Sequence, residues 1–163
     1  MRRRNIAVAI TALALTLVPA RALGSTSVTR HDPDDFEIAP DVHSTTKQMF
    51  QSDRLGRRVR IKVRGELGPR YRLRVLVDSR RGDRADFVMI ATVRRLKLES
   101  CVVRHLFGAE IEARCDADPY RAWWGVARRD LDPDKRIRWR VVALGGAELD
   151  EVTDLAPDTG WYR

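Results

Sequence analysis

The stretch that decides the fold reads RRVRIKVRGELGPRYRLRVLV and covers residues 57–77. Apolar residues take every second position on both sides of a central turn: Val59, Ile61 and Val63, then Leu73, Val75 and Val77. Successive side chains of a strand point to opposite faces, so this period of two predicts two strands, each with one face in a core. The segment GELGP at residues 65–69 is rich in turn formers and predicts that the two strands form a hairpin.

Similar runs follow along the rest of the chain, with turn residues between them. We expect further strands at residues 87–93, 96–103, 110–115, 122–127 and 137–143, and one helical turn at residues 128–132. A pattern of about seven to nine short strands with regular turns predicts an all-β protein, an antiparallel β-sandwich. A small closed β-barrel is the alternative architecture.

The first 22 residues predict a signal peptide. Three arginines precede an apolar run at residues 6–18, and the small-x-small sequence ARA at residues 20–22 suits cleavage by signal peptidase. The apolar run is shorter than the ~20 residues that a transmembrane helix needs. We therefore expect a secreted protein, extracellular or associated with the cell envelope, with no membrane span after cleavage.

The rest of the chain divides into a short lead-in and one domain. Residues 23–35 are small and polar and predict a flexible N-terminal segment, while residues 36–163 suffice for a single β-sandwich domain with an acidic C-terminal tail. Removing the signal peptide takes four arginines and no acid from 31 basic and 23 acidic residues, which leaves a net charge of +4. This moderate charge disfavours nucleic acid as the partner.

Two cysteines, Cys101 and Cys115, lie in this chain, which we expect to be exported. An oxidising compartment favours a disulfide, and no CxxC spacing indicates a redox or metal pair. A three-residue loop centred on Gly108 would make residues 102–112 a hairpin and place Cys101 directly opposite Cys115. A bridge that closes a loop of ~15 residues stabilises a fold by about 3 kcal/mol.

Basic residues fill the polar positions of three expected strands. They are Arg58, Arg60, Lys62 and Arg64, then Arg72 and Arg74, and finally Arg138 and Arg140. If these strands share a sheet, their alternation places all of these cations on one face. Such a face suits an anionic polymer, because guanidinium groups bind phosphate and carboxylate through paired hydrogen bonds. The alternative is an ordinary solvated face whose arginines pair with acidic side chains.

Trp123 and Trp124 offer a second candidate binding site. Neighbouring residues in a strand point to opposite faces, so one tryptophan can lie in the core while the other is exposed. An exposed indole can stack on a sugar ring, which adds a carbohydrate to the candidate ligands. The alternative is that the second sheet or the C-terminal tail covers both tryptophans.

Motifs for metal binding and catalysis are weak. Asp78, Asp83 and Asp86 flank the turn between two expected strands and are weak candidate oxygen ligands for calcium. Apart from this possible calcium ion, the sequence indicates no cofactor. Arginines at positions 80, 81 and 84 oppose a cation there, and a β-turn at Gly82 is the simpler interpretation. The chain lacks GxSxG, HExxH and P-loop patterns, so we assign no catalytic residue and favour a binding protein over an enzyme.

The order of these pieces resembles a loosely defined group of small secreted actinobacterial proteins. The resemblance covers residues 36–161 and rests on the cysteine hairpin and on four stretches: VLVDSRRGDRADFVMI (75–90), WWGVARRDL (123–131), RIRWRVVAL (136–144) and DLAPDTGW (154–161). It implies a secreted β-sandwich and brings no activity and no functional residue.

The resulting functional hypothesis is a secreted, non-catalytic binding module at the cell envelope, with an anionic wall polymer or a carbohydrate as its ligand. Two alternatives remain open. One is a secreted hydrolase that uses loop carboxylates, and the other is a protein-interaction or inhibitor domain.

Overall fold

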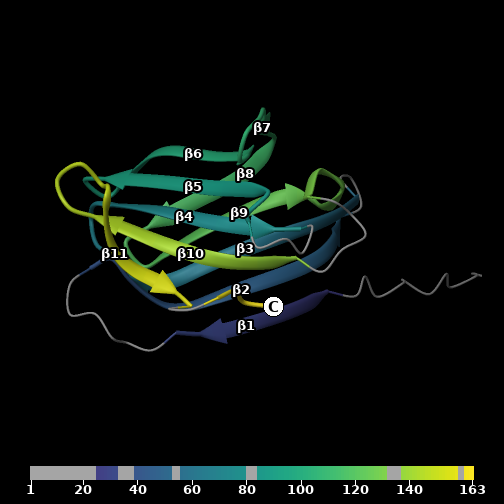
Figure 1. The fold of residues 1–163 in the computed structure, drawn as a ribbon, viewed down its shortest axis with the longest axis horizontal. Helices are drawn as coiled ribbons and strands as arrows, with labels where there is room; N and C mark the ends of the chain where they lie inside the picture. Colours follow the sequence, from purple (N-terminus) through teal and green to yellow (C-terminus); the bar gives the residue numbers. More distant parts are fainter. Residues whose placement is uncertain (1–24, 33–38, 53–55, 80–83, 132–136, 158–159) are drawn as a thin grey trace, which may run out of the picture.

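A computed structural model describes residues 25–32, 39–52, 56–79, 84–131, 137–157 and 160–163. These residues form two antiparallel sheets that face each other, with a short helical turn at one end (Figure 1). Sheet A has the strand order β1-β2-β3-β9-β8, and sheet B has the order β11-β10-β4-β5-β6-β7. The prediction of an all-β sandwich is confirmed, and the closed-barrel alternative is wrong.

The strands agree broadly with the expected runs, except that the run at residues 110–115 is divided between two strands. Two strands precede the first expected run, and one follows the last. Those of sheet A are β1 (Thr26–His31), β2 (Asp41–Ser52), β3 (Gly56–Glu66), β9 (Arg121–Ala127) and β8 (Ala113–Asp118). Those of sheet B are β11 (Glu151–Ala156), β10 (Arg138–Gly145), β4 (Tyr71–Asp78), β5 (Phe87–Arg94), β6 (Lys97–His105) and β7 (Glu110–Ile111). The expected helical turn is the 3-10 helix η1 (Arg128–Leu131).

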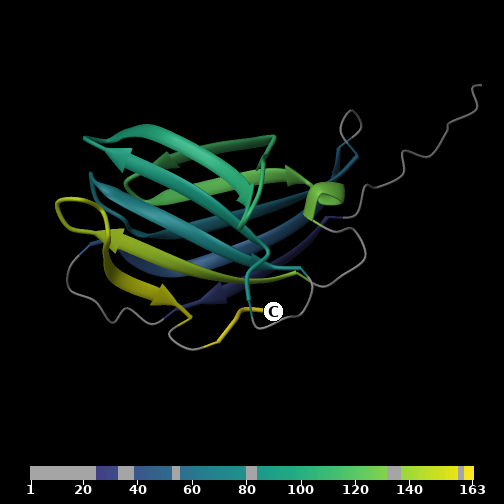
Figure 2. The same ribbon diagram turned by 45° about the horizontal axis from the view of Figure 1, so that its top comes forward.

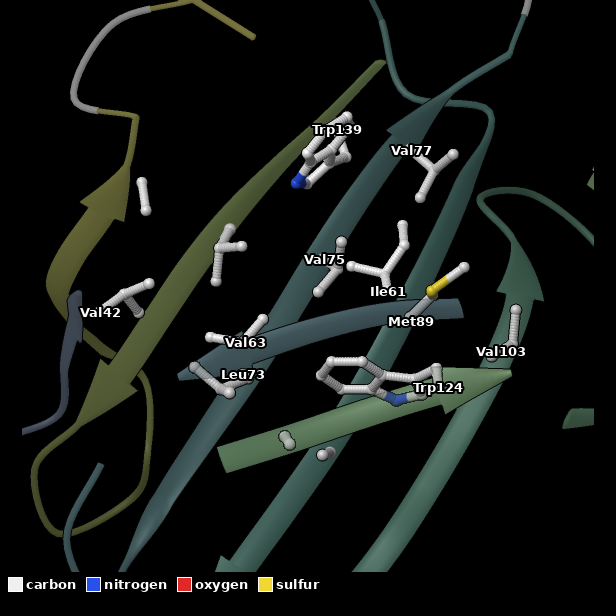
Figure 3. Packing of buried hydrophobic residues seen from close by; sticks show 14 of the residues in the cluster. Val42, Ile61, Val63, Leu73, Val75, Val77, Met89, Val103, Trp124 and Trp139 are labelled. Atoms are coloured by element: carbon white, nitrogen blue, oxygen red, sulfur yellow. The ribbon is translucent and has the colours of Figure 1, made fainter. Parts of the chain in front are cut away.

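The core fills the space between the sheets, and two tryptophans lie in it among aliphatic side chains (Figure 3). Trp124 of sheet A and Trp139 of sheet B are both fully buried. Trp124 Nε1 donates to the Ile90 carbonyl of sheet B at 3.3 Å, and Trp139 Nε1 donates to Thr45 Oγ1 of sheet A at 2.9 Å. Each indole therefore satisfies its buried N–H on the opposite sheet, which orients the two sheets relative to each other.

The hairpin predicted across residues 57–77 is wrong, because β3 belongs to sheet A and β4 to sheet B. The GELGP segment instead carries the chain from one sheet to the other. Leu67 is fully buried, and its N–H donates at 2.9 Å to the carbonyl of Pro119, between β8 and β9. A period of two shows which face of a strand lies in the core, but it does not show to which sheet the strand belongs. A hairpin within one sheet and a crossing between the two sheets therefore both agree with the pattern.

The disulfide between Cys101 and Cys115 is confirmed, with 6.4 Å between the two Cα atoms, but the geometry expected for it is wrong. Val103 pairs with Ile111, so the hairpin register differs from the expected one, and β7 is only two residues long. The chain then leaves sheet B and enters sheet A as β8. The disulfide therefore links β6 of one sheet to β8 of the other instead of closing a hairpin.

Both ends of the described chain are paired with the sheets. Residues 26–31, expected within a flexible segment, form β1 along the edge of β2, and the acidic tail supplies β11 beside β10. Tyr162 forms a backbone bridge with Trp139, and its hydroxyl donates to Asp32 Oδ1 at 2.6 Å. The expected signal peptide lies outside the described residues. Within the part of the chain that the structure describes, no helix is long and apolar enough to cross a membrane.

Candidate functional site

The outer face of sheet A carries the cations of β3. Val59, Ile61 and Val63 point into the core and are fully buried, so the alternate positions of β3 face solvent. These positions hold Arg58, Arg60, Lys62 and Arg64. We call the surface formed by these four cations, by Arg121 and Trp123 of β9 and by Phe50 of β2 the basic face.

Neighbouring strands add to the basic face through their register. On β9, Trp123 lies opposite Lys62 and Arg121 lies opposite Arg64. Directly opposite residues of an antiparallel pair project from the same side of the sheet, so the tryptophan and the cations share one surface. The sequence had presented the basic stripe and the tryptophan as rival sites, and strand pairing combines them.

Arg60 lies between two aromatic rings at the centre of this face. Its guanidinium carbon is 4.8 Å from the ring centroid of Trp123 and 5.1 Å from that of Phe50. Both distances are within the range of a cation–π interaction. Gly125 lies opposite Arg60, and a Cβ atom there would be 3.6 Å from Cζ3 of Trp123. This is an ordinary van der Waals distance, so the indole of Trp123, which is only partly buried, lies directly beside Gly125.

The positive charges on this face act on one another. Partial burial lowers the pKa of Lys62 below its usual value of 10.5, and the charges of Arg64, Arg121 and Arg60 lower it further. Asp118 opposes this effect, and its Oδ2 accepts a hydrogen bond from Arg121 Nε at 2.7 Å. At Lys62, the neighbouring arginines thus add to the effect of burial, and Asp118 acts against both.

The remaining predicted cations lie on the other side of the molecule. Arg72 and Arg74 belong to β4 and Arg138 and Arg140 belong to β10, which are neighbouring strands of sheet B. The condition for all three stripes to share one face, namely that their strands belong to one sheet, is therefore not met. It depended on a hairpin between β3 and β4, and the actual crossing sends the two stripes to opposite outer surfaces.

Two of the sheet B arginines have structural contacts. Arg138 forms a salt bridge with the fully buried carboxylate of Asp78, to which its Nε donates at 2.9 Å. Arg72 donates to the Leu149 carbonyl at 3.3 Å and to Thr92 Oγ1 at 3.4 Å. These contacts hold both guanidinium groups against the fold, so sheet A is the better candidate for binding a polymer.

The two tryptophans point to opposite faces, as their adjacent positions predicted. Trp124 is the core member of the pair and cannot reach a ligand without unfolding. Trp123 is the member on the basic face. The candidate aromatic site therefore reduces to Trp123, supplemented by Phe50 from β2, a residue that the sequence had not singled out.

Two of the three candidate calcium residues, Asp78 and Asp86, have other partners. Asp78 binds Arg138, and Asp86 Oδ2 accepts hydrogen bonds from Ser79 N at 2.9 Å and Ser79 Oγ at 3.1 Å. Asp83 lies outside the described residues. Among the residues that are described, no three acidic, histidine or cysteine side chains have an arrangement suited to a metal ion.

A buried group of carboxylates was not predicted. Asp32, Asp41 and Asp154 are each at least nine-tenths buried where β2 of sheet A approaches the edge strand β11 of sheet B. Asp154 Oδ2 accepts a hydrogen bond from Val42 N at 2.6 Å, and Asp41 Oδ2 lies 3.0 Å from His43 Nε2. Burial raises the pKa of Asp154 to about 6, with further contributions from the charges of Asp32 and Asp41. No local sequence pattern distinguishes these aspartates from the solvated ones.

The description of the fold and of the basic face rests on the structure of this chain alone. Comparisons with protein-family models, with curated proteins and with solved structures give no match to this chain.

Proposed function

We propose that the protein is a secreted, non-catalytic binding module that binds an anionic polymer at the cell envelope through the basic face of sheet A. The observation that carries this proposal is the position of Arg60 between Trp123 and Phe50, on a face that gathers the cations of β3. An anion bound there would relieve the repulsion among these cations.

The spacing of the cations favours a polymer over a small ion. Successive outward residues of a strand are about 6–7 Å apart, because each residue advances the strand by about 3.3 Å. Four cations along β3 therefore present charges over roughly 20 Å. An extended chain with regularly spaced phosphate or carboxylate groups can contact several of them at once. Anionic polymers of the bacterial cell wall have this chemistry.

The aromatic residues favour a polymer that also contains sugar or polyol units. Trp123 is partly exposed, and an indole offers an apolar surface on which a sugar ring can pack. Its contact with Arg60 restricts the guanidinium group, which lowers the entropy lost when an anion binds. The cations would bind the acidic groups of the ligand, and Trp123 would stack on its sugar units. An anionic glycan offers both.

Retention on purified cell wall at increasing NaCl concentrations tests the proposal. Arg60→Gln and Lys62→Gln should each weaken binding by roughly fivefold, since an exposed charge pair contributes about 1 kcal/mol. Arg74→Gln is the matched control, because it removes an exposed cation from the outer face of sheet B. We expect it to bind like the wild type.

Two results would contradict the proposal. One is retention that does not change between low and high salt, since binding by exposed charges is screened. The other is equal loss in the Arg60→Gln and Arg74→Gln variants, which would indicate a general effect of net charge. If Trp123→Ala alone abolishes binding and salt has no effect, the ligand is a neutral sugar and the anionic assignment is wrong.

A further inference from the structure

A pocket at one end of the sandwich is lined by three arginines. It lies where β3 passes to β4 and β5 turns into β6, near the loop between β10 and β11 at the left of Figures 1 and 2. Its volume is about 480 Å³, and it is lined by Pro69, Arg70, Arg94, Arg95 and Glu99. Three guanidinium groups and one carboxylate give the pocket a net charge of +2.

The turn that supplies Arg95 has an unfavourable backbone. Arg95 and Leu96 connect β5 to β6 with φ angles of 51° and 66°, a left-handed conformation that such hairpin turns normally give to asparagine or glycine. Each non-glycine residue in this conformation costs about 1–2 kcal/mol. The Leu96 N–H donates to the Pro69 carbonyl at 3.0 Å, which holds the turn against the β3–β4 segment and so at the pocket wall.

The other two arginines are held in place from outside the turn. Arg94 Nε lies 3.2 Å from Glu99 Oε2, and the Arg70 guanidinium donates to the carbonyl of Ala147 in the β10–β11 loop. The Arg70 contact occupies one of the five N–H donors of its guanidinium group, whereas Arg94 faces Glu99 as an ion pair without a hydrogen bond from its Nε. They orient the two side chains at the pocket while other donors remain to bind a ligand.

From this arrangement we propose that the pocket binds a doubly charged tetrahedral oxyanion, the phosphate or sulfate group of a small molecule or of a polymer end. A net charge of +2 matches a phosphate monoester, which carries close to two negative charges at neutral pH. Arginine is suited to such groups because its planar fork donates two parallel hydrogen bonds. The volume falls within the range of small-molecule sites, about 300–1,000 Å³, so there is room for more than the oxyanion.

This site is separate from the basic face in position. The pocket is built from the β3–β4 loop and the β5–β6 hairpin at one end of the sandwich, whereas the basic face lies on the outer surface of sheet A. Strained backbone is often found at binding sites because the surrounding structure must hold it in place. The unusual turn at Arg95 and Leu96 is therefore an observation in support of the site that is independent of the charges.

Amide NMR titration of the purified protein at fixed ionic strength tests this site, with inorganic phosphate, sulfate, glycerol 3-phosphate and acetate as probes. The dianionic probes should shift the amides of residues 94–96 and bind at least tenfold more tightly than acetate. Arg95→Gln should weaken phosphate binding at least tenfold, and Glu99→Gln should strengthen it several-fold. Lys97→Gln is the matched control, because Lys97 is an exposed cation of the same hairpin that does not line the pocket.

Equal weakening by Arg95→Gln and Lys97→Gln, or equal affinity for acetate and phosphate, would overturn the proposal. Tighter binding of glycerol 3-phosphate than of phosphate identifies the phosphoryl group of a larger ligand, and the reverse identifies the free ion. Arg60→Gln should leave phosphate binding unchanged while it weakens retention on cell wall. The two proposals can therefore fail separately.

Discussion

Replacing Asp154 with asparagine should remove a pH dependence of stability that originates at one buried carboxyl. Asp154 is fully buried on β11, where its Oδ2 accepts the N–H of Val42 at 2.6 Å. Burial raises the pKa of this carboxyl from 3.8 to about 6, and the charges of Asp32 and Asp41 contribute to the rise. The backbone hydrogen bond acts in the opposite direction and does not cancel it.

The sign and size of the effect follow from the two pKa values. A carboxyl whose pKa is higher in the folded state binds its proton more tightly there, so protonation stabilises the fold. This contribution is complete below about pH 3.8 and is lost as the pH rises through about 6. One pKa unit corresponds to about 1.4 kcal/mol, so the loss at pH 7 amounts to about 3 kcal/mol. Asparagine stays neutral at every pH, so the Asp154→Asn variant does not lose this stabilisation as the pH rises.

Urea unfolding of both proteins between pH 4 and pH 8 measures this difference. We expect similar free energies of unfolding at pH 4 and an advantage for Asp154→Asn that grows to about 3 kcal/mol at pH 7.5. Subtracting the wild type removes the contributions of the carboxylates that do not interact with Asp154, while those of Asp32 and Asp41 remain coupled to it. Asp150→Asn, at an exposed position just before β11, is the control and should show no such trend. A difference between Asp154→Asn and the wild type that stays constant across this pH range would refute the reasoning.

Three further predictions concern stability in urea. Replacing Cys101 and Cys115 with serine should lower the free energy of unfolding by about 3 kcal/mol, since the bridge closes a loop with a sequence separation of 14 residues. Arg138→Gln should cost about 3–5 kcal/mol, because it removes the cation beside the buried carboxylate of Asp78; a loss below 1 kcal/mol would contradict this. Leu96→Asn should raise stability by up to about 1 kcal/mol by relieving the left-handed backbone, and an unchanged or lower stability would argue against strain there.

The sequence determined the features that depend on local alternation. A period of two placed Val59, Ile61 and Val63 in the core and set the cations of β3 on the opposite side. The same rule separated Trp123 from Trp124. The predicted export of the chain favoured pairing of its two cysteines. These inferences needed only the geometry of a strand and the chemistry of the side chains, so they did not depend on which strands became neighbours.

Only the tertiary structure decided which surfaces these residues share. The crossing at GELGP sent β3 and β4 to different sheets, so the arginine stripes separated and Trp123 came to lie beside Arg60. The same long-range pairing turned the disulfide into a link between sheets and buried Asp154. A strand with one apolar face gains nearly the same burial in either sheet, and the choice depends on contacts with residues distant in sequence. The alternation of apolar and polar residues within a strand does not predict those contacts.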